Sequence, residues 1–130
     1  MHQLVYTSTA GVALTETELQ QQLASWRQKN ADLAVTGVLL HSEGQILQVL
    51  EGESATVQAL FATIAADIRH RSVTKLADGP VQARAFADWS MGFRNVVSTQ
   101  FLRFVPSALP EHTADLVPLL EAFLTEEPWT

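Results

Sequence analysis

Two β-rich segments separated by three residues constrain the fold more than any other feature of this chain. The segments are 35–41 (VTGVLLH) and 45–50 (QILQVL), and the residues between them run from Ser42 to Gly44. A connection this short is typical of a hairpin, so the two strands are expected to be antiparallel neighbours in one sheet. We therefore place a β-hairpin at the centre of the fold.

Two amphipathic segments flank this hairpin. The first is predicted to begin near Thr15, which forms a capping box with Glu18 and is followed by apolar residues at three- and four-residue steps. The second is predicted to begin at the helix cap Ser54 and to end around Arg69 and His70. Further strands are expected at 4–7, at 73–76 and 81–86 as one strand interrupted around 78–80, and at 89–93.

The order strand, helix, strand, strand, helix, strand, strand predicts a ferredoxin-like α+β sandwich. Both helices would cover one face of a five-stranded sheet, because each exposes one apolar stripe. A chain of 130 residues has room for one such domain, which we assign to 1–95. Residues 96–130 are expected to form a C-terminal helical extension that covers the other face or contacts a second subunit.

Composition argues against several classes of function. The net charge of −6 and the scattered basic residues do not suit a nucleic-acid partner. The chain has no cysteine, and its four histidines lack metal-ligand spacing, so we expect no metal site. It has neither a secretory signal nor a long apolar run, so we expect a cytoplasmic protein without a membrane partner. Glu51 and Glu53, near a turn, are interpreted as solvated rather than catalytic.

Gln48 is a polar residue within an apolar strand. A buried amide must pair its donor and acceptor or lose about 1–3 kcal/mol. Tyr6 in the first strand and Asn30 near the end of the first helix have a similar character, and the predicted topology brings all three together only between the helices and the sheet. We expect a cleft there that holds a planar heteroaromatic ligand. Taken singly, Tyr6 or Gln48 could face water at a sheet edge, and Asn30 could be a helix C-cap.

At these residues the chain resembles the BLUF family, small flavin-binding domains that sense blue light. The matching segments are LVYTS (4–8), Asn30 with VTGVLL (35–40), QVLEG (48–52), DIRH (67–70) and RAFADWSMGF (84–93). Together they span about residues 3–95, in the order found in the family.

The resemblance implies a photochemical role for several of these residues. Tyr6 is expected to donate an electron and a proton, and Gln48 to bridge the phenol to the flavin and then rotate or tautomerise. Trp89 and Met91, on the fifth strand beside Gln48, are expected to exchange places. The cofactor, FAD or alternatively FMN or riboflavin, would be held by Tyr6, Ser8, Asn30, Gln48, Asp67, Arg69 and His70.

The resemblance also implies a sensor without enzymatic activity that signals through a separate protein effector or a homo-oligomer. Two positions depart from the family: relatives often carry a small residue at Trp26 and a basic one at Thr63. An indole at Trp26 suggests the main alternative, a flavin-free interaction module in which the indole occupies the cleft. A hydrolase resembling an acylphosphatase is the second alternative, but 9–14 has no arginine to cradle an anion.

Overall fold

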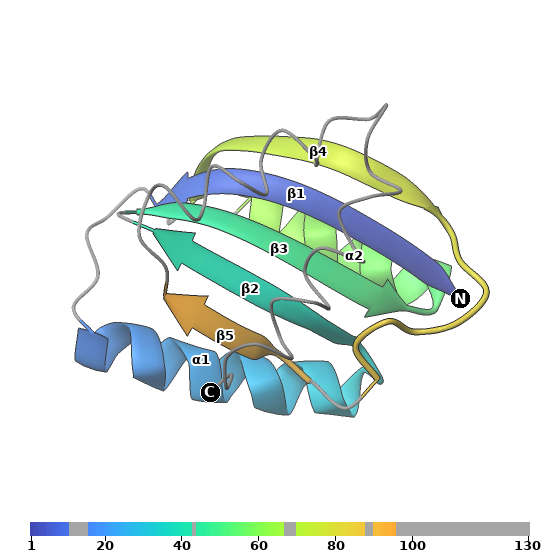
Figure 1. Cartoon of the computed structure of the whole chain (residues 1–130), viewed down its shortest axis with the longest axis horizontal. Helices are drawn as coiled ribbons and strands as arrows, with labels where there is room; N and C mark the ends of the chain where they lie inside the picture. The colour runs from blue at the N-terminus through green and yellow to red at the C-terminus, as the bar shows by residue number, and fades with distance from the viewer. Residues whose placement is uncertain (11–15, 43, 67–69, 88–89, 96–130) are drawn as a thin grey trace.

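A single curved sheet with two helices on one face forms the framework of the protein. The computed structural model describes residues 1–10, 16–42, 44–66, 70–87 and 90–95. Four antiparallel strands lie in the order β4-β1-β3-β2, and a short fifth strand, β5, pairs parallel to β2 (Figure 1). The strands are β1 (His2–Ala10), β2 (Thr36–Ser42), β3 (Gln45–Gly52), β4 (His70–Pro80) and β5 (Gly92–Asn95), and the helices are α1 (Glu16–Asp32) and α2 (Ser54–Ala66).

The predicted hairpin is confirmed as the pair β2 and β3 at the centre of the sheet. Leu39 of β2 lies opposite Gln48 of β3, and Gln48 in turn lies opposite Tyr6 of β1. These strands are buried on both faces, which explains why they read as nearly continuous apolar runs. Gly37 is required in β2 because any β-carbon there would collide with the carbonyl oxygen of Val49.

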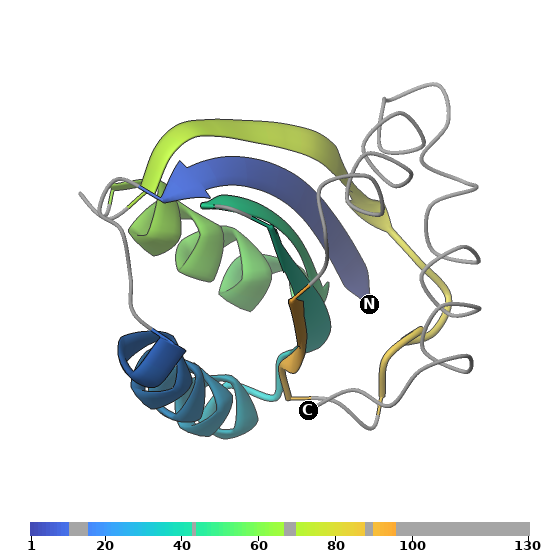
Figure 2. The same cartoon turned by 60° about the vertical axis from the view of Figure 1, so that its left-hand side comes forward.

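Both helices pack on the concave face of the sheet, as Figure 2 shows, and the α+β class with two helices on one face is confirmed. Leu23 of α1 and Val57 of α2 are completely buried against sheet residues such as Leu4 and Leu50. Each side chain buried in this way stabilises the fold by about 1.5–3 kcal/mol. The two apolar stripes read from the sequence are therefore the surfaces that hold the helices to the sheet.

The end of α1 fixes the position of Asn30. The amide of Val35 donates to the carbonyl of Asn30 at 2.8 Å, and the amide of Ala34 donates to the carbonyl of Ala31 at 3.2 Å. These two bonds form a Schellman motif, in which the residue after the helix adopts a left-handed conformation. Here that residue is Ala34, with a φ of 55°. The C-cap interpretation of Asn30 is therefore wrong, because Asn30 lies inside the last turn of the helix.

The predicted interruption of the fourth strand is wrong. β4 runs without a break from His70 to Pro80, with Gly79 paired to Gln3 and Pro80 paired to His2. A proline is tolerated there because β4 lies at the edge of the sheet, where one side of the strand needs no partner. Beyond it, residues 81–86 form bends rather than the expected strand.

Other boundaries also differ from expectation. α2 is described as far as Ala66, and His70, expected near the end of that helix, is instead the first residue of β4. β5 begins at Gly92 rather than at position 89. The expected C-terminal extension, 96–130, lies outside the described residues. Neither α1 nor α2, the helices of the described ranges, combines the length and the apolar character that crossing a bilayer requires.

Candidate functional site

A buried phenol and a buried amide form the centre of the site. Tyr6 and Gln48 are cross-strand partners on β1 and β3, so their side chains project from the same face of the sheet. The Tyr6 hydroxyl donates a hydrogen bond to Gln48 Oε1. Tyr6 has no exposed surface, and this burial raises the pKa of its phenol far above the ordinary value. The phenol is therefore a neutral hydrogen-bond donor at physiological pH.

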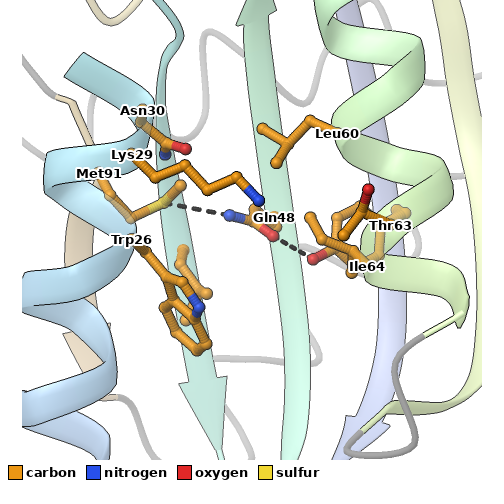
Figure 3. Close-up of a pocket in the computed structure, with 10 residues that line it drawn as sticks. Trp26, Lys29, Asn30, Gln48, Leu60, Thr63, Ile64 and Met91 are labelled. Carbon is orange, nitrogen blue, oxygen red and sulfur yellow. Dashed lines mark hydrogen bonds between the residues drawn. The ribbon is translucent and has the colours of Figure 1, made fainter. Parts of the chain in front are cut away.

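Gln48 connects this phenol to a third group. Its Nε2 donates to the sulfur of Met91 at 3.2 Å, the contact drawn as a dashed line in Figure 3. A thioether is a weak acceptor, and an amide offers two N–H donors and two acceptor lone pairs. Among the described residues, Gln48 uses one donor and one acceptor. The amide is thus partly satisfied and has spare hydrogen-bonding capacity for a ligand.

Helix α1 holds the backbone next to Met91. Arg27 Nε donates to the carbonyl oxygen of Met91 at 2.9 Å, and Asn30 Nδ2 donates to the carbonyl oxygen of Ser90 at 2.8 Å. Partial burial lowers the pKa of the Arg27 guanidinium, which nevertheless remains a strong cation. Two side chains of one helix face therefore fix the segment that supplies the thioether to Gln48.

A cleft opens above Gln48, between the two helices. Its cavity volume is about 90 Å³, below the range of about 300–1,000 Å³ for small-molecule sites, so side chains between the helices have to shift before a ring can enter. In Figure 3 the α1 residues and Met91 lie on one side of Gln48 and the α2 residues on the other. The lining residues are Tyr6, Trp26, Lys29, Asn30, Leu39, Gln48, Leu60, Thr63, Ile64 and Met91. Apolar walls with amides at one end suit a planar ring that carries polar groups on one edge.

The two positions that depart from the family pattern both line this cleft. Trp26 is half-buried on the α1 wall, and in Figure 3 the side chain of Lys29 from the same helix extends toward Gln48. Thr63 lies on the α2 wall, where its hydroxyl donates to the carbonyl of Ala59 at 3.1 Å. The indole therefore narrows the cleft from one side without filling it.

The structure brings together Tyr6, Gln48, Asn30 and Met91, as the sequence predicted. Met91, however, does not come from a strand beside Gln48. Met91 precedes β5, and β2 separates β5 from β3, so the expectation that the fifth strand lies beside Gln48 is wrong. Its side chain reaches Gln48 from the segment before the strand. Ser8 is buried in β1 but is absent from the described residues that line the cleft.

Four predicted site residues cannot be placed in the cleft. Asp67, Arg69 and Trp89 lie outside the described residues. His70 is described only through its backbone, as the first residue of β4.

Sequence reasoning missed Glu51, whose interpretation as a solvated turn residue is wrong. Glu51 is completely buried in β3, where its carboxylate accepts hydrogen bonds from the amides of Ala85 at 2.6 Å and Phe86 at 2.9 Å. Thr36 Oγ1 at 3.1 Å and Gln3 Nε2 at 3.4 Å also donate to it. The sequence did contain a signal for the burial of Glu51, since this residue directly continues the apolar run of the predicted strand. Lys29 was also missed, although it directly precedes Asn30 on the helix.

Comparison with known proteins gives one consistent family. The family model described as "BLUF: Sensors of blue-light using FAD" matches residues 1–92. A photoactivated adenylate cyclase subunit beta of Euglena gracilis is 40% identical over 63 residues, which cover 48% of this chain and 7% of that protein. A beta-like subunit of the same organism is 30% identical over 89 residues, which cover 68% of this chain and 10% of that protein. The chain thus spans a small part of these curated relatives.

Solved structures show the same relationship. BlrB, a BLUF protein in its dark state, superposes with a TM-score of 0.77 and 30% sequence identity, covering 95% of this chain and 96% of BlrB. BlrP1 of Klebsiella pneumoniae with FMN and cyclic diGMP gives a TM-score of 0.67 and 31% identity, covering 72% of this chain and 25% of BlrP1. With the family model matching most of the sequence and a solved relative covering nearly all of it, this chain belongs to the BLUF family, sensors of blue light using FAD.

Proposed function

We propose that this chain binds a flavin in the cleft between α1 and α2 and responds to blue light through Tyr6 and Gln48. One observation carries the proposal: a fully buried phenol donates to a buried amide whose other end contacts Met91, at the floor of an open cleft. A purely structural core rarely leaves an amide partly satisfied beside empty space.

The residues of the cleft fit a flavin ring. The amides of Gln48 and Asn30 would meet its polar edge, and Leu60 and Ile64 of α2 would meet an apolar face opposite Trp26 of α1. We propose FAD as the cofactor, following the family description, with FMN as the alternative because the similar BlrP1 structure contains FMN. Ser8, Asp67, Arg69 and His70 remain proposed contacts from the family resemblance.

A bound flavin excited by blue light supplies a strong one-electron oxidant. Tyr6 would give up one electron to that oxidant and would pass its phenolic proton along its hydrogen bond to Gln48 Oε1. Both return to Tyr6 after the Gln48 amide has rearranged, by rotation or through a tautomer. Rotation exchanges Oε1 with Nε2 and so breaks the contact with Met91, because an oxygen and a thioether sulfur are both acceptors. If Gln48 rotates, Met91 therefore distinguishes its two states.

The altered contact would pass to β5, which begins at the residue after Met91. Arg27 binds the carbonyl of Met91 and Asn30 binds that of Ser90, so the backbone of this segment is fixed at two points. A movement of the thioether would therefore act on a short, anchored segment. We propose that Trp89 takes part in this exchange and that the output is a changed contact with a protein effector or a second copy of the chain, without catalysis by this domain. The expectation of a cytoplasmic receptor is part of the same proposal.

Absorption spectra recorded before and after blue illumination test the proposal. The purified protein should be yellow and should show a small red shift that reverses in the dark. Gln48→Leu removes both hydrogen bonds with little change of volume and should bind flavin without the shift. Gln45→Leu, at an exposed position of the same strand, is the matched control and should respond normally. A normal photocycle in Gln48→Leu would remove Gln48 from the mechanism, and a protein that stays colourless after flavin reconstitution would support the flavin-free module.

A further inference from the structure

Tyr6 has a charged neighbour on the side away from Gln48. Its cross-strand partner on β4 is Lys75, and its ring contacts Phe61 of α2 with centroids 5.4 Å apart and planes tilted by 59°. The Lys75 ammonium lies over the same Phe61 ring, 5.1 Å from the centroid, at a distance typical of a cation–π contact. The phenol ring and a positive charge therefore contact the same aromatic ring.

An acidic residue partly compensates this charge. Lys75 Nζ lies 2.9 Å from Asp78 Oδ2, and Asp78 also accepts from Gln58 Nε2 at 2.6 Å and pairs with His2. The hydrogen bonds from Lys75 and then His2 lower the pKa of Asp78 to about 2. Asp78 is therefore ionised at physiological pH, so a pair of opposite charges lies beside Phe61.

Burial makes Tyr6 sensitive to this pair. The phenol has no contact with solvent, whereas the side chains of Lys75 and Asp78 are 39% and 24% exposed, so water screens part, but not all, of their effect on Tyr6. The removal of an electron from a phenol creates positive charge. A nearby cation opposes that step, and a nearby anion favours it.

We propose that the ion pair of Lys75 and Asp78, next to Tyr6 and Phe61, influences how readily Tyr6 gives up its electron. The inference rests on the proposed role of Tyr6 as donor. Lys75 makes oxidation of Tyr6 harder, and Asp78 offsets part of that effect. Both are positioning residues, since neither lines the cleft within the described part of the chain.

The decay of flavin fluorescence in the loaded protein, less the decay that remains in Tyr6→Phe, measures how fast Tyr6 loses its electron. Lys75→Met removes the cation and should make this decay about threefold faster, whereas Asp78→Asn should make it about threefold slower. Lys75→Arg keeps the charge and should restore the original rate. Asp32→Asn removes a surface carboxylate at the end of α1, far from β4 in sequence. It is the control, and we expect it to leave the fluorescence decay unchanged.

A second measurement needs no flavin. Tyr6 is the sole tyrosine of the chain, so biosynthetic replacement with a more acidic fluorinated tyrosine labels this position alone. Titration of the flavin-free protein then gives the pKa of the labelled phenol. Lys75→Met should raise this pKa, because the phenolate loses a favourable cation, and Asp78→Asn should lower it. A merely structural role for the pair would not move the pKa in opposite directions.

Changes of opposite sign in Lys75→Met and Asp78→Asn support the inference. Changes of the same sign, or changes no larger than that of the Asp32→Asn control, overturn it. Tyr6→Phe separates this failure from failure of the proposed function. If Tyr6→Phe kept a full light-induced shift, the donor role would be rejected and the inference with it. If Tyr6→Phe abolished the shift while the Lys75 and Asp78 variants matched the control, the inference alone would fail.

Discussion

The two faces of strand β3 carry buried polar residues of opposite character. Gln48 and Glu51 are three residues apart, and because side chains alternate along a strand, they project from opposite faces of the sheet. Glu51 accepts hydrogen bonds from Gln3, Thr36, Ala85 and Phe86. Gln48 has Tyr6 and Met91 as its described partners and lies beside an open cleft.

This difference separates a structural polar group from the one that we propose to respond to light. A fully satisfied carboxylate has one favourable arrangement, because any movement breaks several bonds at once. Arg84 reinforces the arrangement by donating to Thr36 Oγ1 at 2.8 Å and to the Glu51 carbonyl at 3.1 Å. A partly satisfied amide can instead exchange partners at little cost. The same strand thus carries a rigid anchor on one face and an adaptable group on the other.

The largest effect is expected from Tyr6→Phe, which tests the adaptable face. The substitution removes one hydroxyl and keeps the ring contact with Phe61, so flavin should remain bound. The light-induced absorption shift should disappear completely, because no phenol remains to supply the electron and proton. Stability should fall by only about 1 kcal/mol, the value of one hydrogen bond. A full shift in this variant would reject the donor assignment.

Glu51→Gln tests the rigid face. The replacing amide keeps one acceptor oxygen, but its nitrogen cannot accept from the second of the two backbone amides, those of Ala85 and Phe86, so the free energy of unfolding should fall by about 2–3 kcal/mol. Denaturant unfolding of the flavin-free protein measures this change, and Glu53→Gln, at an exposed neighbouring position, is the control. The light-induced shift should persist. Equal stability of the two variants would show that Glu51 is not the anchor described above.

Met91→Leu tests the link between Gln48 and β5. The substitution keeps the volume of the side chain but removes the sulfur acceptor, which destabilises the dark arrangement of the amide. Recovery in the dark, followed by absorbance, should become about threefold slower, since the state to which Gln48 returns has lost a contact. Recovery at the original rate or faster would contradict the proposed role of the thioether.

Trp26→Ser should have the smallest effect. The indole narrows the cleft without filling it, so its removal should not lower the ratio of bound flavin to protein. That ratio is measured from the absorbance of the purified protein. A clear loss of flavin would show that the indole instead supports the ring.

Local patterns were sufficient to predict the central hairpin, the two helices and the meeting of Tyr6, Gln48 and Asn30. Side-chain periodicity fixes which face a residue occupies, and the order of the elements leaves one place where these three residues meet. The family resemblance supplied their expected roles and the choice of cofactor.

The surroundings of Glu51 could not be predicted in the same way. Its strongest partners are backbone amides 34 and 35 residues further along the chain, and a backbone amide carries no signature in the sequence. The end of α1 was equally hidden, because Ala34 adopts a left-handed conformation that is usually occupied by glycine. The continuation of β4 through Gly79 and Pro80 depends on its place at the sheet edge, which only the assembled sheet defines.

The hydrogen bonds from α1 to the segment before β5 have a consequence for engineering. Arg27 and Asn30 both bind main-chain carbonyls, which every amino acid possesses. The side chain of Ser90 can therefore be varied, and different output sequences can be grafted after this point, without loosening the attachment. In the proposed mechanism, Met91 is the residue of this segment whose side chain matters, because its sulfur contacts Gln48.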